Sequence, residues 1–168
     1  KTALMCAAQN GHTEIVNLLL SRNSDIDAKD NSRGTALMLA AINGDTEICK
    51  LLIERGADIH AIDECGYNAL MWAAYRRFIE TVALLVDKGA YMLPKNTDGK
   101  YAITYVIENE NRDSVLYTID KEINYVSLFV LEKNRVLYNR FLAFPGGPGG
   151  FRELREAGRN HFHRSWYL

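Results

Sequence analysis

The sequence predicts an all-α solenoid, in which short helix-turn-helix units joined by hairpin loops stack along the chain. Three observations predict it. The segment Thr2–Met5 recurs as Thr35–Met38 and again, with Asn in place of Thr, as Asn68–Met71, each time 33 residues further on. Apolar residues within each unit follow helical spacing. Glycines stand where the apolar stretches end, and a fixed period of about 20–50 residues is the signature of a repeat architecture.

The first helix of the second unit follows from its residue types. The Thr35 hydroxyl can cap a helix whose apolar stripe contains Leu37 and the pair Ala40-Ala41. The small alanine side chains let neighbouring helices approach closely. Gly44 predicts the end of this helix, because glycine adopts the left-handed conformation at little cost.

A second helix is predicted from the apolar residues of 48–52, and Gly56 ends it. Residues 58–66 then form an extended hairpin that leads into the next unit. A pair of short helices cannot bury its own apolar face. Each unit therefore depends on stacking against its neighbours, and stability is spread along the array.

The repeated unit resembles the ankyrin repeat, whose pattern is a turn with Gly, T-P-L-H-x-A-A, a G-H turn and an L-L stretch that ends in G-A-D. Between Gly34 and Asp63 the second unit carries T-A-L-M-L-A-A, N-G-D, L-L-I and G-A-D-I-H-A. Ala replaces the Pro of that pattern, and Met replaces its His. We expect an ankyrin-repeat solenoid of about four units over residues 1–121, with the first unit truncated and the last, from 96 onward, divergent.

The chain departs from the period after residue 121. Apolar residues near one helical face predict a helical cap over 122–143, with a partner-binding helix as the alternative. Residues 144–168 begin with a Pro- and Gly-rich linker and predict a disordered basic tail.

Composition and charge exclude several classes of protein. A net charge of −1 gives no electrostatic case for nucleic acid or an anionic membrane as partner. The apolar run 126–131 is far shorter than the roughly 20 residues that a membrane-spanning helix needs. Cys6, Cys49 and Cys65 form no C-x-x-C pair, which predicts free thiols in a reducing compartment, the cytoplasm or the nucleus.

No catalytic constellation or cofactor motif is present. His12 occupies the G-H turn, where the resemblance implies a structural hydrogen bond. His161 and His163 form an H-x-H pair without a third ligand nearby in sequence. We therefore expect a protein that is not an enzyme and that holds neither a cofactor nor a metal ion.

The resemblance also implies where a partner binds, on a concave face made of the hairpin tips and the exposed side of the inner helices. Transferred position by position, that surface comprises Asn31, Ser32, Ile42 and Asn43, then Glu64, Cys65, Tyr67, Tyr75 and Arg76, then Thr97, Lys100 and Glu108. The units differ from one another at these positions. Such variation is expected of residues that contact a partner rather than hold the fold.

The third unit departs most from the others. Arg76-Arg77 replaces the Asn-Gly turn, and Trp72 stands where the first two units carry Cys and Leu. Trp, Tyr and Arg dominate binding hot spots, so we predict that Trp72, Tyr75 and Arg76 form the centre of the binding surface. The alternative is that Trp72 fills the core and the two arginines form a solvated turn. Arg77 should cost about 1 kcal/mol if it keeps the left-handed conformation.

The predicted function is binding of an unidentified protein partner by a monomer, without nucleic acid or membrane. Two alternatives remain open. The chain could be a regulatory or targeting segment of a larger multidomain enzyme such as an ankyrin-repeat kinase, which the start at Lys1 rather than Met favours. It could also be a structural spacer, a reading that Trp72 and Tyr75 argue against.

Overall fold

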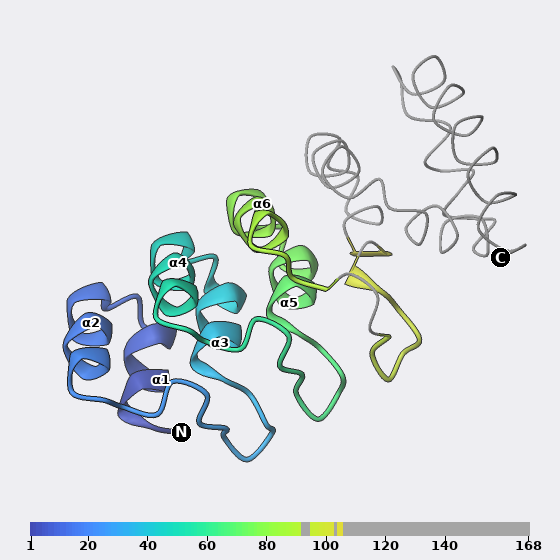
Figure 1. Ribbon diagram of the computed structural model, residues 1–168. Helices are drawn as coiled ribbons and strands as arrows, with labels where there is room; N and C mark the ends of the chain where they lie inside the picture. The colour runs from blue at the N-terminus through green and yellow to red at the C-terminus, as the bar shows by residue number, and fades with distance from the viewer. Residues whose placement is uncertain (92–94, 103, 106–168) are drawn as a thin grey trace, which may run out of the picture. The chain divides into compact units, whose positions relative to one another are not determined.

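The computed structural model describes residues 1–91, 95–102, 104 and 105, all of which lie in one compact unit that spans Lys1–Glu122. Over these residues it contains six helices and no strand (Figure 1). The helices are α1 Ala3–Gln9, α2 Thr13–Ser21, α3 Ala36–Asn43, α4 Thr46–Glu54, α5 Ala69–Tyr75 and α6 Ile79–Asp87. The predicted cap over 122–143, the predicted tail over 144–168 and most of the fourth unit lie outside the described residues.

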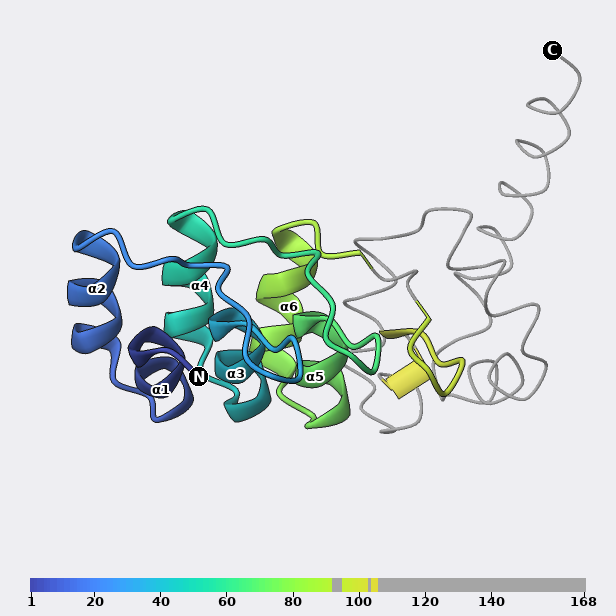
Figure 2. The ribbon, with the colours of Figure 1, turned by 90° about the horizontal axis from the view of Figure 1, so that it is seen from below.

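The six helices form three helix-turn-helix pairs that stack side by side, which confirms the predicted all-α repeat fold (Figure 2). We call α1, α3 and α5 the inner helices and α2, α4 and α6 the outer helices. The inner helices pack on one another in a row, α1 on α3 and α3 on α5, and each outer helix packs on the inner helix before it. The hairpin loops project on the side of the inner row (Figure 1).

Each inner helix begins at a side-chain cap on the same repeat position. The cap oxygen accepts a hydrogen bond from the backbone N–H three residues on, at 3.3 Å for Thr2 to Met5, 3.4 Å for Thr35 to Met38 and 2.8 Å for Asn68 to Met71. Such a bond satisfies one of the amide groups that a helix N-terminus leaves unpaired. Asn68 is fully buried, and its Nδ2 also donates to the Tyr91 carbonyl at 2.9 Å, so this cap ties the third repeat to the loop after it.

The core repeats with the sequence. Every inner helix buries the same leucine, methionine and alanine pair: Leu4, Leu37 and Leu70, Met5, Met38 and Met71, and the pairs Ala7-Ala8, Ala40-Ala41 and Ala73-Ala74. The outer helices bury Val16, Cys49 and Val82 at one equivalent position. Burial, with a smaller effect of the Asp45 carboxylate, raises the pKa of the Cys49 thiol to about 12. This cysteine is therefore a neutral core side chain.

Three backbone positions in each unit have a positive φ, and at each of them one unit carries a residue other than glycine. The three sets are Gly11, Gly44 and Arg77; Asn23, Gly56 and Gly89; and Arg33, Gly66 and Gly99. Arg77 has φ 68°, so the third unit keeps the left-handed turn without its glycine, as the sequence led us to consider. The backbone repeats even where the residue best suited to it does not.

The outer helices begin less uniformly. Asp45 caps α4 by accepting a hydrogen bond from the Ile48 N–H at 3.1 Å, whereas neither His12 at α2 nor Phe78 at α6 makes a side-chain capping bond. The structural bond expected of His12 is therefore not found at the helix cap. Phe78 instead lies against the turn of the preceding repeat, where an ideal Cβ on Gly44 would stand 2.3 Å from its ring.

Candidate protein-binding face

One polar side chain organises each hairpin loop. Each accepts hydrogen bonds from two backbone N–H groups of its own loop: Asp30 from Ser32 (3.0 Å) and Gly34 (2.8 Å), Asp63 from Cys65 and Tyr67 (both 2.9 Å), and Asn96 from Asp98 (3.1 Å) and Lys100 (2.8 Å). These bonds hold the tip of each loop in a defined turn.

Backbone hydrogen bonds join one hairpin to the next. The Glu64 N–H donates to the Ser32 carbonyl at 3.0 Å, and the Thr97 N–H donates to the Cys65 carbonyl at 2.9 Å. All four of these residues belong to the predicted binding surface. The loops therefore present a continuous row whose backbone is ordered before any partner arrives, which lowers the entropy that binding would cost.

Four aromatic side chains from the third repeat and the segment after it form one cluster, Tyr67, Trp72, Tyr75 and Tyr105, which we call the aromatic cluster. Tyr67 stacks on Trp72 with 4.5 Å between ring centroids. Tyr75 stands nearly perpendicular to the other three rings, at 5.6–6.5 Å. Edge-to-face and offset-stacked pairs of this kind contribute about 0.5–1.5 kcal/mol each beyond the area they bury.

Hydrogen bonds to polar groups hold the aromatic cluster in place. The Trp72 Nε1–H donates to Asp63 at 2.9 Å, the carboxylate that also organises its hairpin. The Tyr105 hydroxyl accepts from Asn96 Nδ2 at 2.7 Å and lies 2.5 Å from the Tyr67 hydroxyl, which donates to Asp98 at 3.3 Å. Burial raises the pKa of Tyr67 above its ordinary value, and Tyr105 and Asp98 raise it further. The Tyr67 phenol is therefore neutral at physiological pH and can donate its proton in a hydrogen bond.

The members of the cluster differ in what they offer to a partner. Tyr105 is 4% exposed and Tyr75 is 52% exposed, while Tyr67 and Trp72 are half-buried. The indole N–H of Trp72 and the hydroxyl of Tyr67 are already bonded within the protein. Tyr75 is thus the aromatic side chain that this surface presents, and the other three rings hold it in place.

The structure describes all but one of the predicted binding residues. Exposed are Asn31, Ser32, Asn43, Glu64, Cys65, Tyr75, Arg76 and Thr97; half-buried are Ile42, Tyr67, Trp72 and Lys100. Glu108 lies outside the described residues. Tyr67, Trp72 and Tyr75 meet in the aromatic cluster, and the Lys100 Nζ lies 5.3 Å from the centroid of the Tyr105 ring. The hairpin residues form a separate row beside them.

Sequence reasoning missed Tyr105, Asp63 and Asp98 as parts of this site. The repeat period contained the signal for Tyr105, which stands 33 residues after Trp72 and so at the same place in the next unit. Asp63 and Asp98 also lie on the period, 33 residues after Asp30 and Cys65, but this spacing does not show which side chains they bond. Their roles depend on which side chains fold over the hairpins.

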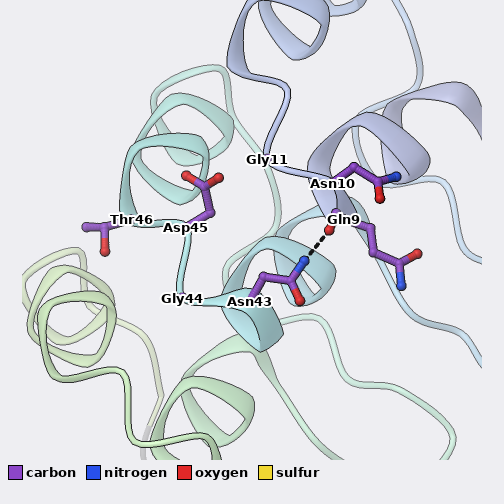
Figure 3. Close-up of a pocket in the computed structure, with 7 residues that line it drawn as sticks. All are labelled: Gln9, Asn10, Gly11, Asn43, Gly44, Asp45 and Thr46. Atoms are coloured by element: carbon purple, nitrogen blue, oxygen red, sulfur yellow. Dashed lines mark hydrogen bonds between the residues drawn. The ribbon is translucent and has the colours of Figure 1, made fainter.

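A polar hollow of about 560 Å³ lies between the turns of the first two repeats (Figure 3). It is lined by Gln9, Asn10, Gly11, Asn43, Gly44, Asp45 and Thr46. The Asn43 side chain donates to the Gln9 carbonyl across it. Asn43, one of the predicted binding residues, thus joins two neighbouring repeats at the edge of the face.

In the part of the chain that the structure describes, no three His, Cys, Asp or Glu side chains gather as a metal ion would need, and no helix is long and apolar enough to cross a membrane. All three cysteines are free, with Cys6 and Cys65 exposed and Cys49 buried. The H-x-H pair at 161–163 lies outside the described residues.

The family model described as ankyrin repeats (3 copies) matches residues 1–63 and 37–128, which together span most of the chain. No curated protein sequence matches the chain at a significant level. The matched ranges include all six helices of the described residues and every part of the aromatic cluster.

Proposed function

Because the chain belongs to the ankyrin-repeat family, whose members generally act as protein-protein interaction modules, we propose that it binds a partner protein on the face formed by its hairpin loops and inner helices. Trp72, Tyr75 and Arg76 form the centre of that surface. The hairpin residues and Asn43 extend it on either side. Binding rests on a few anchors held by a preorganised scaffold, and the protein itself carries out no reaction.

The aromatic cluster is the observation that carries this proposal. Tyr75 is half exposed at a position where the first two repeats carry Gln9 and Ile42. Edge-to-face contacts with three further rings fix its orientation. An exposed aromatic side chain on a rigid base gives a large contact area at little cost in side-chain entropy. A structural spacer has no need of such an anchor.

We further propose that the protein acts as a monomer in the cytoplasm or nucleus, whether alone or as a regulatory segment of a larger enzyme. The three unpaired thiols favour a reducing compartment. The near-neutral net charge of −1 favours neither nucleic acid nor a membrane as partner. The protein-binding surface is the same in either setting.

The test replaces Tyr75 by the residue of the second repeat. Tyr75→Ile should leave the fold intact, because the side chain is half exposed and its neighbours stay bonded to one another. Loss of a hot-spot anchor typically costs about 2 kcal/mol, so affinity for a partner captured from source-cell lysate should fall about thirtyfold. The measurement is quantitative capture with mass spectrometry, followed by titration of the purified partner.

Leu18→Ala is the matched control, because Leu18 is 54% exposed on the outer helix α2. This variant loses a similar exposed apolar side chain away from the proposed face, and its affinity should stay unchanged. Equal affinity of Tyr75→Ile and the parent protein would remove the proposed site. The capture of no partner by any variant would favour the spacer.

A further inference from the structure

We propose that the C-terminal ends of the inner helices bind an extended segment of the partner in which a carboxylate lies about three residues from an apolar side chain. This inference rests on the proposed function and specifies the chemistry of its partner. It concerns six residues at two repeat positions: Gln9-Asn10, Ile42-Asn43 and Tyr75-Arg76.

The six residues form a graded row, because the inner helices that carry them stack side by side. The first pair is polar, the second is apolar and polar, and the third is aromatic and cationic. Ile42 is half-buried and Tyr75 is half exposed, so apolar surface is available at the second and third repeats. A partner that crosses the row meets amides first, then apolar surface, then positive charge.

The amide groups at the polar end favour an extended partner over a helical one. Gln9 Oε1 accepts from Lys1, and Asn43 Nδ2 donates to the Gln9 carbonyl. Gln9 Nε2 remains as a donor and Asn43 Oδ1 as an acceptor at the rim of the hollow (Figure 3). An extended segment offers free backbone N–H and C=O groups to such amides, whereas a helix uses its own groups internally.

Arg76 defines the charge of the partner. Its side chain is exposed, and within the described part of the chain its guanidinium forms no hydrogen bond or ion pair. A planar guanidinium pairs best with a carboxylate, which it can hold through two parallel hydrogen bonds. Tyr75 beside it supplies apolar contact that shields such a pair from water.

The spacing follows from the stacking of the helices. Packed helices lie about 8–10 Å apart, and an extended chain advances about 3.3 Å per residue. An extended segment therefore moves from Ile42 to Arg76 in about three residues. A helix rises only about 1.5 Å per residue and would need about six.

The experiment is a selection from a library of random peptides displayed on phage, made in parallel on three proteins: the parent chain, Arg76→Glu and Lys88→Glu. Lys88 is exposed just after the outer helix α6, so the third protein carries the same change of charge away from the row. The parent should enrich peptides with Asp or Glu three residues from an apolar residue. Arg76→Glu should enrich Lys or Arg at that place and bind the parent's peptides at least about tenfold more weakly. Lys88→Glu should select as the parent does.

Three results would overturn the inference: an unchanged acidic preference in Arg76→Glu, a preferred spacing of about six residues, as a helix would give, or no enrichment on the parent chain. A selection on Tyr75→Ile separates this inference from the proposed function. If the parent enriches apolar peptides without acidic residues and Tyr75→Ile loses them, the proposed binding face is supported and the proposed carboxylate in the partner is rejected. If Tyr75→Ile keeps every peptide, the face itself is wrong.

Discussion

The second and third repeats are built on the same backbone and core, and they differ in what they present. Leu37 and Leu70 are each 1% exposed, and the methionine that follows each of them is as deeply buried. At four other positions, however, the second repeat carries Gly34, Leu39, Ile42 and Asn43 where the third carries Tyr67, Trp72, Tyr75 and Arg76. Residues that repeat hold the stack together, and residues that change give one unit an aromatic, cationic surface that its neighbour lacks.

The two repeats differ at the turn between their helices as well. The second has Gly44 followed by Asp45, which caps α4, and the third has Arg77 followed by Phe78. Phe78 makes no side-chain capping bond to α6, and its ring packs on Gly44. The third repeat therefore depends on a glycine of the second.

The largest effect is expected from Gly44→Ala. An alanine at this position must keep the backbone φ of 73°. Its Cβ would also stand 2.3 Å from the Phe78 ring, so the ring has to move. Left-handed backbone costs about 1–2 kcal/mol and overpacking about 1–3 kcal/mol. We expect the free energy of unfolding to fall by about 2–5 kcal/mol, measured by chemical denaturation.

Gly56→Ala isolates the backbone part of that cost. Gly56 also has a positive φ, 91°, but an added Cβ meets no atom within 4 Å. This variant should lose only about 1–2 kcal/mol. In a Phe78→Asp background, which restores the residue of the second repeat, Gly44→Ala should cost no more than Gly56→Ala. Equal losses for the two alanines in the parent chain would show that Phe78 yields without strain.

The sequence predicts the fold because the fold repeats. The repeated unit predicts the cap at Thr35, the buried alanine pairs and the left-handed turn at Gly44, and the structure confirms each of them. These features depend on local residue type and on stacking that is the same in every unit. The family then follows from the period and the motif together.

The candidate site was harder to predict because it depends on departures from the period. The spacing of Trp72 and Tyr75 placed them on one helix face, and their rings do meet. It could not show that Asp63 engages the indole N–H, because that bond depends on the path of the hairpin over the helix. The exposed share of each ring likewise depends on packing between units.

Cys49 occupies a core position at which the other two repeats carry a valine, Val16 and Val82. The pKa of Cys49 is raised from 9.0 to about 12 in the folded protein. Below about pH 9 the thiol is neutral in both the folded and the unfolded chain. Above it the unfolded chain releases the proton first, so stability is lost as pH rises from 9 toward 12.

Cys49→Val removes this dependence and keeps the core filled. At about pH 10, one unit above the ordinary thiol pKa, the parent should have lost about 1.4 kcal/mol more than the variant, relative to about pH 7. Urea denaturation at the two pH values measures the difference, and every other titrating group contributes equally to both proteins. Parallel loss in the two proteins would mean that Cys49 ionises in the folded state as easily as in the unfolded chain.

The smallest effect concerns the hairpins, where Arg33 stands in the loop before the second repeat and Gly66 in the loop before the third. Arg33 has φ 62°, and its equivalents Gly66 and Gly99 have 75° and 73°. Arg33→Gly should raise the free energy of unfolding by about 0.5–1 kcal/mol, because relief of the left-handed strain exceeds the added flexibility of the unfolded chain. Asn23→Gly, at φ 58°, should change it far less, since asparagine tolerates this conformation. Thermal denaturation of the parent protein and both variants measures these changes in the free energy of unfolding. If Arg33→Gly destabilises the protein, then contacts of the arginine side chain stabilise the hairpin before the second repeat. The two loops would then differ in more than the residue at this position.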